Sequence, residues 1–204
     1  MSRYDEGLTP PRTFTDREQH ALLRTTGERR DGYRDHMVFS IALGTALREH
    51  EIVALDLGDV FDDQGGARRR VALRVFKRSN PNRRQQQVLL NETVRAKLEK
   101  FRTWKQMNGE SVEPTAPLFV SRKRNRLSKR QVRRLVHVWQ ARAGADVTHN
   151  FHALRHTAIT NYYRLKPDPR ATQKFSRHAS LQEVQRYTHP SDEDQARVIQ
   201  RLPC

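Results

Sequence analysis

Apolar side chains recur at the spacing of an α-helix in several segments of this 204-residue chain. The periodicity predicts a helix over residues 32–46 and further helices that begin after Asn91 and Ser128, both good N-cap residues. Another helix is expected after Thr15, because Thr15 and Glu18 have the spacing of a capping box. Since amphipathic helices need a shared core, the sequence predicts a mostly helical fold. The expected apolar faces comprise Leu22, Leu23, Tyr33, Met37, Val38, Ile41, Ala42, Val94, Leu98, Phe101, Val132, Leu135, Val136 and Trp139.

The middle of the chain has a pattern that is typical of a small antiparallel sheet. Short runs rich in β-branched residues alternate with turn-forming residues, and a short buried extended piece is expected at 117–120. The expected strands are Val60-Phe61, RVALRVFK (70–77) and QQQVLL (85–90), and the expected turns are 62–66 and 79–82. The predicted fold class is therefore α+β: a mostly helical single domain with a small three-stranded antiparallel sheet.

The length and the polar start of the chain indicate how it is organised. Residues 1–13 are polar and include Pro10-Pro11, so they are expected to be an arm or a linker remnant. Residues 14–204 are long enough to form one domain with a substantial core. We find no internal repeat with a solenoid period.

The balance of charge is strongly basic. The chain has 39 Lys and Arg against 23 Asp and Glu, and a net charge of +16. This excess predicts a polyanionic partner, most simply double-stranded DNA. No apolar run is long enough to cross a bilayer and the N-terminus lacks the apolar core of a secretory signal, so no membrane association is expected. The single cysteine, Cys204, excludes a disulfide framework, and we expect a cytoplasmic, DNA-associated protein.

Basic residues gather around the helix predicted after Ser128. Two groups are expected to contact the DNA backbone: Arg122, Lys123, Arg124 and Arg126 in the preceding loop, and Arg130, Arg133 and Arg134, with His137, on the helix. The alternative is a solvated helix face. Such faces usually mix charges, whereas no acidic residue interrupts 121–144. Contacts of this kind carry no sequence specificity.

Several chemically capable side chains each have an ordinary explanation when taken alone. Arg48 could be a surface arginine, and Tyr187 a core aromatic. His152 and His156 have a spacing that suggests a metal site, but HALRH lacks the glutamate of HExxH and no cysteine or acidic cluster lies nearby. No metal is therefore expected.

The order and spacing of these residues favour a single site. Arg48 lies in ALREHE with Glu51 three positions later, and HALRHT carries His152 and Arg155. His178 precedes Tyr187 by nine positions within RHASLQEVQRYTH. This ordered set resembles the C-terminal catalytic domain of the tyrosine recombinases, the phage integrase family, over roughly residues 14–200. The family pattern is an arginine box, a lysine on a β-hairpin, HxxR, a second His or Trp, and a tyrosine.

Three features of this chain differ from the family pattern or are matched to it by position only. The family lysine lies on the β-hairpin, where Lys77 is the best match in position. The family usually has Leu-Gly-His where this chain has Ser176-Arg177-His178. We also expect the usual N-terminal core-binding domain to be absent, because the predicted catalytic domain begins at residue 14.

The resemblance implies a DNA breaking and rejoining enzyme. Tyr187 would attack the scissile phosphate to form a 3′-phosphotyrosyl link, while Arg48 and Arg155 neutralise the non-bridging oxygens. His178 would donate a hydrogen bond to the same phosphate. Lys77 would protonate the leaving 5′ oxygen, and His152 would exchange the tyrosine proton. Glu51 would support a cationic neighbour, and no cofactor is required.

The resemblance also implies self-association, because the family normally acts as a tetramer on DNA. Tyr162 and Tyr163 do not fit the position of the family nucleophile and are expected to be structural.

Two alternatives to a recombinase stay open. The first alternative is a non-catalytic DNA-binding relic or regulator, which would have no need of Tyr187. The second is the related chemistry of type IB topoisomerases, although HALRHT and the arginine box are more similar to integrases.

Overall fold

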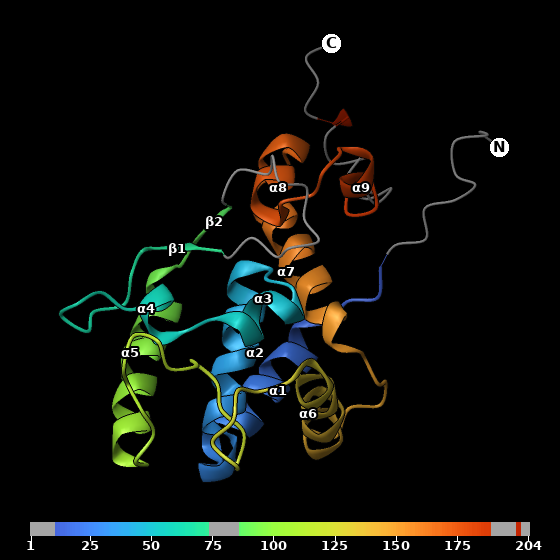
Figure 1. Cartoon of the computed structure of the whole chain (residues 1–204). Coiled ribbons are helices and arrows are strands. Elements are labelled where there is room, and N and C mark those ends of the chain that lie inside the picture. The colour runs from blue at the N-terminus through green and yellow to red at the C-terminus, as the bar shows by residue number, and fades with distance from the viewer. Residues whose placement is uncertain (1–10, 74–85, 189–198, 201–204) are drawn as a thin grey trace. The chain divides into compact units, whose positions relative to one another are not determined.

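The computed structural model describes residues 11–73, 86–188 and 199–200 (Figure 1). The described chain divides into two compact units, one spanning Arg12–Ala158 and the other containing the described residues from Ile159 onward. None of the helices in the described ranges combines the length and apolar character needed to cross a membrane.

The first unit is built around the helix α2 (Tyr33–Thr45). Helix α2 packs against α1, α3 and α5, and α6 packs against both α1 and α3. Figure 1 shows α5 and α6 on either side of α1 and α2. The other elements of this unit are α1 (Asp16–Glu28), the 3-10 turn η1 (Arg30–Gly32), α3 (Glu49–Ala54), α4 (Leu57–Val60), α5 (Glu92–Met107), α6 (Lys129–Arg142) and the first part of α7 (Phe151–Leu165).

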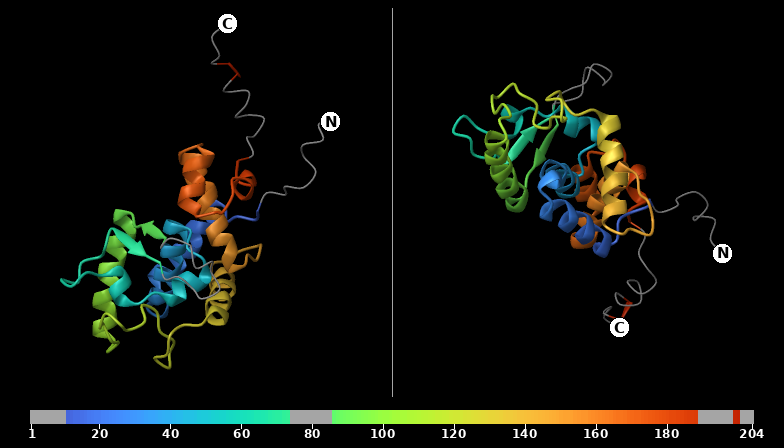
Figure 2. Two further views of the ribbon diagram at one scale, coloured as in Figure 1. Left: turned by 45° about the horizontal axis from the view of Figure 1, so that its top comes forward. Right: turned by 90° about the horizontal axis from the view of Figure 1, so that it is seen from below.

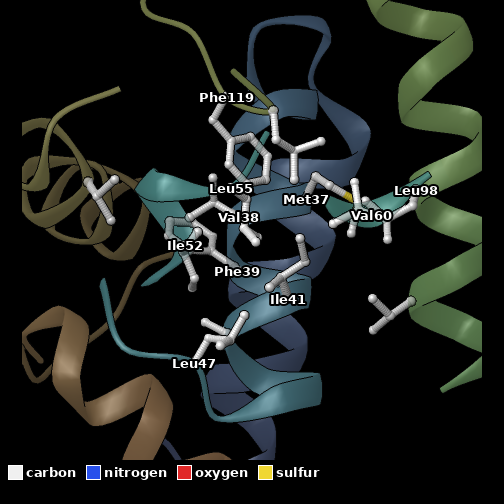
Figure 3. Close-up of a cluster of buried hydrophobic side chains, with 14 of the residues drawn as sticks. Met37, Val38, Phe39, Ile41, Leu47, Ile52, Leu55, Val60, Leu98 and Phe119 are labelled. Atoms are coloured by element: carbon white, nitrogen blue, oxygen red, sulfur yellow. The ribbon is translucent and has the colours of Figure 1, made fainter. Parts of the chain in front are cut away.

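Helix α2 is central because it is apolar on nearly every side. The consecutive residues Met37, Val38 and Phe39 are all buried, although consecutive positions of a helix face different directions (Figure 3). A helix that is apolar all round must be covered by its neighbours. Ile52 from α3 and Leu98 from α5 supply part of that cover.

The sheet is smaller than the sequence analysis predicts. Among the described residues it has two strands, β1 (Arg70–Ala72) and β2 (Gln87–Leu89), which pair antiparallel. Figure 2 shows this pair beside α5. The predicted first strand at Val60-Phe61 is wrong, because Asp56 and Asp59 form a capping box that places Val60 in α4. Phe61 then forms only an isolated bridge with Ala67.

The helical predictions are confirmed at their ends as well as in their centres. Thr15 and Glu18 form the expected capping box of α1. The side chains of Asn91 and Ser128 accept hydrogen bonds from Val94 N and Gln131 N, and so cap α5 and α6. The extended piece at 117–120 contributes the buried residues Leu118, Phe119 and Val120. The mostly helical α+β class is therefore confirmed, with two described strands in place of three.

The second unit contains the end of α7, α8 (Pro169–Ser176) and α9 (Gln182–Gln185). Asp168 caps α8 by accepting hydrogen bonds from Arg170 N and Ala171 N, and Pro169 occupies the first helical position. Helices α8 and α9 pack against each other. Tyr162 stacks on Phe175, with 4.3 Å between ring centroids. This packing agrees with the structural role that the sequence analysis predicts for Tyr162.

Candidate active site

Arg48 is held at the start of α3 by Glu51. The backbone N–H of Arg48 donates to Glu51 Oε2 over 2.6 Å, and Arg48 Nη1 lies 3.2 Å from Glu51 Oε1. The same carboxylate therefore closes the first turn of α3 and fixes the direction of the guanidinium. The Arg48 side chain remains 31% exposed, so the guanidinium is available to an anion.

Arg155 lies against the turn that precedes Arg48. Helix α2 ends at Thr45, and Ala46 adopts the left-handed conformation with φ of 53°. The Ala46 carbonyl accepts a hydrogen bond from Arg155 Nη1, and Arg155 is fully buried. Ala46 lies two residues before Arg48, so this contact brings Arg155 of HALRHT to the segment that holds Arg48, although 107 positions separate the two arginines in the sequence.

His152 is an exposed residue in the first turn of α7. Its ring meets that of His156 edge to face, with 4.4 Å between centroids. Within the described ranges, no group of three or more His, Cys, Asp or Glu side chains is arranged to hold a metal ion. Near Arg48, burial lowers the pKa of His50, although Glu51 opposes this change.

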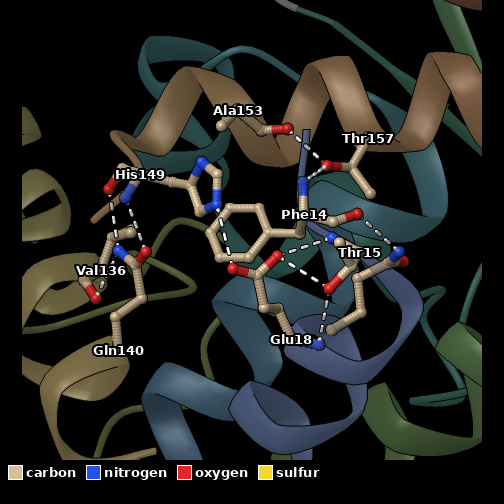
Figure 4. Close-up of polar contacts among 9 residues, drawn as sticks. Phe14, Thr15, Glu18, Val136, Gln140, His149, Ala153 and Thr157 are labelled. Carbon is tan, nitrogen blue, oxygen red and sulfur yellow. Dashed lines mark hydrogen bonds and ion pairs between the residues drawn. The ribbon is translucent and has the colours of Figure 1, made fainter. Parts of the chain in front are cut away.

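A polar network that no pattern in the sequence predicts fixes the start of α7 (Figure 4). Gln140 of α6 donates to the backbone O of His149 over 2.8 Å and accepts from its N–H over 2.7 Å. His149 Nε2 lies 3.4 Å from Glu18 Oε1. Thr157 Oγ1 accepts from Phe14 N over 2.8 Å. These bonds tie α1 and α6 to the helix that carries His152 and Arg155, and the 131 positions between Glu18 and His149 leave no sequence pattern.

Glu18 has two partners in this network. Burial raises the pKa of Glu18, but hydrogen bonds from Thr15 and His149 outweigh burial, so the pKa is lower overall. The carboxylate therefore stays ionised while it caps α1 and contacts His149. The capping role could be predicted from the sequence, whereas the contact with His149 could not.

His178 and Tyr187 lie together in the second unit. Their rings are nearly parallel, with an interplanar angle of 15° and 5.8 Å between centroids. Ser176 Oγ lies 2.9 Å from His178 Nδ1, which fixes the ring of the histidine. Tyr187 N donates to Val184 O at the end of α9, and Tyr187 is 6% exposed.

The structure therefore places the predicted site residues in two groups. Arg48, His152 and Arg155 belong to the unit of residues 12–158, and His178 and Tyr187 to the other unit. Lys77 lies outside the described residues. The assignment of these side chains to one catalytic site remains a prediction.

Comparison with known proteins decides the family. The model of the phage integrase family matches residues 12–194. The chain belongs to the phage integrase family. It is 32% identical over 159 residues to tyrosine recombinase XerC of Corynebacterium glutamicum, covering 78% of this chain and 47% of the relative. It is 30% identical over 179 residues to tyrosine recombinase XerD of Staphylococcus epidermidis, covering 84% and 55%. The chain thus spans about half the length of these relatives.

Solved structures show the same fold. The XerA recombinase gives a TM-score of 0.76 at 24% identity, over 96% of this chain and 67% of that chain. The XerH recombinase bound to difH substrate gives 0.71 at 20% identity, over 97% and 56%. The catalytic domain of bacteriophage HP1 integrase gives 0.58 at 14% identity, over 94% and 95%. At these identities the likeness establishes the integrase fold.

The basic residues predicted to meet DNA differ in how they are engaged in this integrase-family chain. The exposed side chains of Arg122, Lys123, Arg130 and Arg134 make no hydrogen bond or ion pair within the described part of the chain. Arg124 donates to Asn108 O over 2.6 Å. Arg126 donates to Val53 O and Leu55 O over 3.1 Å and pairs with Asp56. Arg124 and Arg126 therefore hold the loop in place, which gives them a structural role.

Proposed function

We propose that this chain is the catalytic part of a site-specific DNA recombinase that breaks and rejoins DNA through a 3′-phosphotyrosyl bond on Tyr187. Membership of the phage integrase family and likeness to relatives named tyrosine recombinase support this proposal. The observation that carries it is the pairing of His178 with Tyr187, whose rings lie 5.8 Å apart. DNA binding alone would not require a tyrosine beside a histidine.

The cleavage step follows from the chemistry of these side chains. The Tyr187 oxygen attacks phosphorus, the new P–O bond joins the tyrosine to the 3′ side, and the bond to the 5′ oxygen breaks. His152 receives the phenol proton, since the ordinary pKa of histidine, about 6.5, suits a proton acceptor at neutral pH. Lys77 gives a proton to the leaving 5′ oxygen. Rejoining reverses these transfers when a 5′-hydroxyl attacks the phosphotyrosine.

Charge neutralisation is the task of the other residues. Negative charge grows on the non-bridging oxygens as the phosphorus becomes five-coordinate, and fixed cations that face these oxygens lower the barrier. Arg48, oriented by Glu51, and Arg155, oriented by the Ala46 carbonyl, are the proposed cations. His178 donates a hydrogen bond to the same phosphate. This scheme uses no metal ion or nucleotide.

Double-stranded DNA is the proposed substrate and partner. Solved neighbours include XerH bound to difH substrate and the Tn1549 transposon integrase in complex with transposon right end DNA. The net charge of +16 fits such a partner, as do Arg130 and Arg134 of α6, whose side chains have no acidic partner among the described residues. Exchange of strands between two duplexes requires more than one active subunit, so we also propose self-association on DNA.

Trapping of the covalent intermediate tests the proposal. The protein is incubated with a pool of nicked duplex fragments, because loss of the short nicked strand prevents rejoining. We expect a protein–DNA adduct that survives SDS, is absent with Tyr187→Phe, and persists with the control Tyr163→Phe. No adduct with the unmodified protein, or an adduct with Tyr187→Phe, would contradict the assignment. Binding without an adduct would favour the non-catalytic alternative.

A further inference from the structure

Arg133 of α6 is engaged differently from its neighbours on the same helix. Its Nε donates to Glu49 Oε2 over 2.8 Å, and its Nη2 donates to Glu49 Oε1. Glu49 is the first residue of α3 and directly follows Arg48. Arg130 and Arg134 have no such carboxylate within the described residues. One basic side chain of this face is thus occupied by an acidic group of the same chain.

The contact has the geometry of phosphate recognition. A guanidinium binds two oxygens of a carboxylate or of a phosphate through the same two parallel N–H groups. The hydrogen bond from Arg133 is the largest influence on Glu49, and it lowers the pKa of this carboxyl group against the effect of burial. Lys129 and His50 lower the pKa further. Glu49 is therefore ionised and sits where basic groups converge, as a phosphate would.

The pair is also weak enough to exchange. The side chain of Arg133 is 60% exposed and that of Glu49 is 19% exposed. Ion pairs with an exposed partner contribute only about 0.2–1 kcal/mol, since solvent screens them. A DNA phosphate can therefore replace Glu49 as the partner of Arg133, because the ion pair that must break is weak. The pair between Lys105 and Glu110, with a lysine that is fully buried, is the opposite case in this protein.

We propose that Glu49 occupies Arg133 in place of a DNA backbone phosphate, and that DNA binding exchanges the carboxylate for the phosphate. The inference rests on the proposed function for its DNA partner and adds a mode of regulation at that surface. Because Glu49 begins the helix that follows Arg48, the exchange links phosphate binding on α6 to the segment that holds Arg48. Glu49 itself lowers the affinity for DNA that the helix would otherwise have.

A double-mutant cycle tests the exchange with generic duplex DNA, which needs no recombination site. The affinities of the unmodified protein, Glu49→Gln, Arg133→Ala and the double variant are measured across a range of salt. We expect Glu49→Gln to tighten binding about two- to fivefold, because Arg133 no longer has to leave a carboxylate. In the R133A background the same substitution should change the affinity less than about twofold, because Glu49 acts through Arg133.

The matched control is Glu92→Gln. Glu92 is also the first residue of a helix and pairs with an arginine three positions later, Arg95, at 2.9 Å. The substitution Glu92→Gln removes the same charge as Glu49→Gln, so any general effect of net charge on DNA affinity appears in both variants. Thermal unfolding of each variant confirms that the fold is retained.

Three results would overturn the inference. The first is that Glu49→Gln leaves the DNA affinity unchanged or weakens it. The second is that Glu49→Gln raises the affinity equally with and without Arg133, which would mean that Glu49 only repels DNA by its charge. In both cases the unmodified protein still binds DNA, so the proposed function stands. The third is no DNA binding by any of the four proteins, which would remove the proposed DNA partner together with the exchange.

Discussion

At the scale of single residues, Arg177 adopts a backbone conformation that side chains with a Cβ avoid. It follows α8 in the left-handed region, with φ of 58°, and its N–H donates to Gln173 O. Glycine is favoured at this position of a helix end, since it has no Cβ to meet the following carbonyl. Arg177 stands where the Leu-Gly-His of the family has glycine, and this backbone conformation gives the physical reason for the usual glycine.

Replacement of Arg177 by glycine is therefore expected to stabilise the protein. The left-handed conformation costs about 1–2 kcal/mol for a residue with a Cβ, and the greater freedom of unfolded glycine offsets about 0.4–1 kcal/mol. We expect Arg177→Gly to raise the free energy of unfolding by about 0.5–1 kcal/mol, measured by urea denaturation. Arg170→Gly, within the same helix, should lower it. A loss of stability with Arg177→Gly would show that contacts of the side chain outweigh the strain.

Residues that act over long sequence distances are the part of the site that the sequence could not supply. Glu51 could be assigned to Arg48, because three positions on a helix bring them together. The pairs of Glu49 with Arg133 and of Glu18 with His149 join residues 84 and 131 positions apart. Neither pair leaves a periodic pattern, since only the tertiary fold brings the partners within reach.

At the scale of elements, a buried hydrogen bond fastens α6 to α2. Trp139 Nε1 donates to Asp35 Oδ2 over 2.8 Å, and both side chains are buried. Arg34 pairs with the other oxygen of Asp35 at 2.6 Å. A buried carboxylate that loses a donor keeps its desolvation cost, so the bond contributes to the position of the basic helix.

Trp139→Phe is expected to destabilise the protein by about 1–3 kcal/mol, because Asp35 then has an unsatisfied buried oxygen in addition to the lost packing. The control is Trp104→Phe in α5, a half-buried indole that stacks on Phe101 and makes no hydrogen bond through Nε1 within the described residues. Equal losses in the two variants, measured by chemical denaturation, would contradict the role of the hydrogen bond.

The helices could be predicted where apolar residues recur at regular spacing on one face. The apolar spacing of α2, α5 and α6 and the caps Asn91 and Ser128 fixed these helices within a few residues. The strand at Val60 failed for a local reason, since its apolar pair follows Asp56 and Asp59, whose capping box favours a helical turn. Short elements are decided by such contacts rather than by periodicity.

At the scale of the whole molecule, the basic charge is expected to dominate DNA affinity. Each phosphate contact contributes about 0.9 to the slope of log affinity against log salt. Arg130→Ala with Arg134→Ala should reduce that slope by about 1.8, because both residues are exposed on the proposed contact face. Arg17→Ala with Arg24→Ala on α1 removes the same charge and should leave the slope nearly unchanged. Equal reductions by the two double variants would place DNA elsewhere.

The division into two units had no mark in the sequence. The boundary between residues 158 and 159 falls inside α7, a helix of 15 residues that contains no glycine or proline. The ordered motifs did indicate the family, which the match over residues 12–194 confirms. The internal division, in contrast, depends on packing that no local pattern records.

Identification of the residue that binds DNA covalently tests the central claim most directly. After trapping on nicked duplex, the adduct is digested with nuclease and protease, and the peptide that carries a nucleotide is sequenced by mass spectrometry. We expect the nucleotide to be joined through its 3′ phosphate to Tyr187, and not to Tyr162 or Tyr163. A nucleotide on another tyrosine, or on a residue of another type, would contradict the assignment of Tyr187 as the nucleophile.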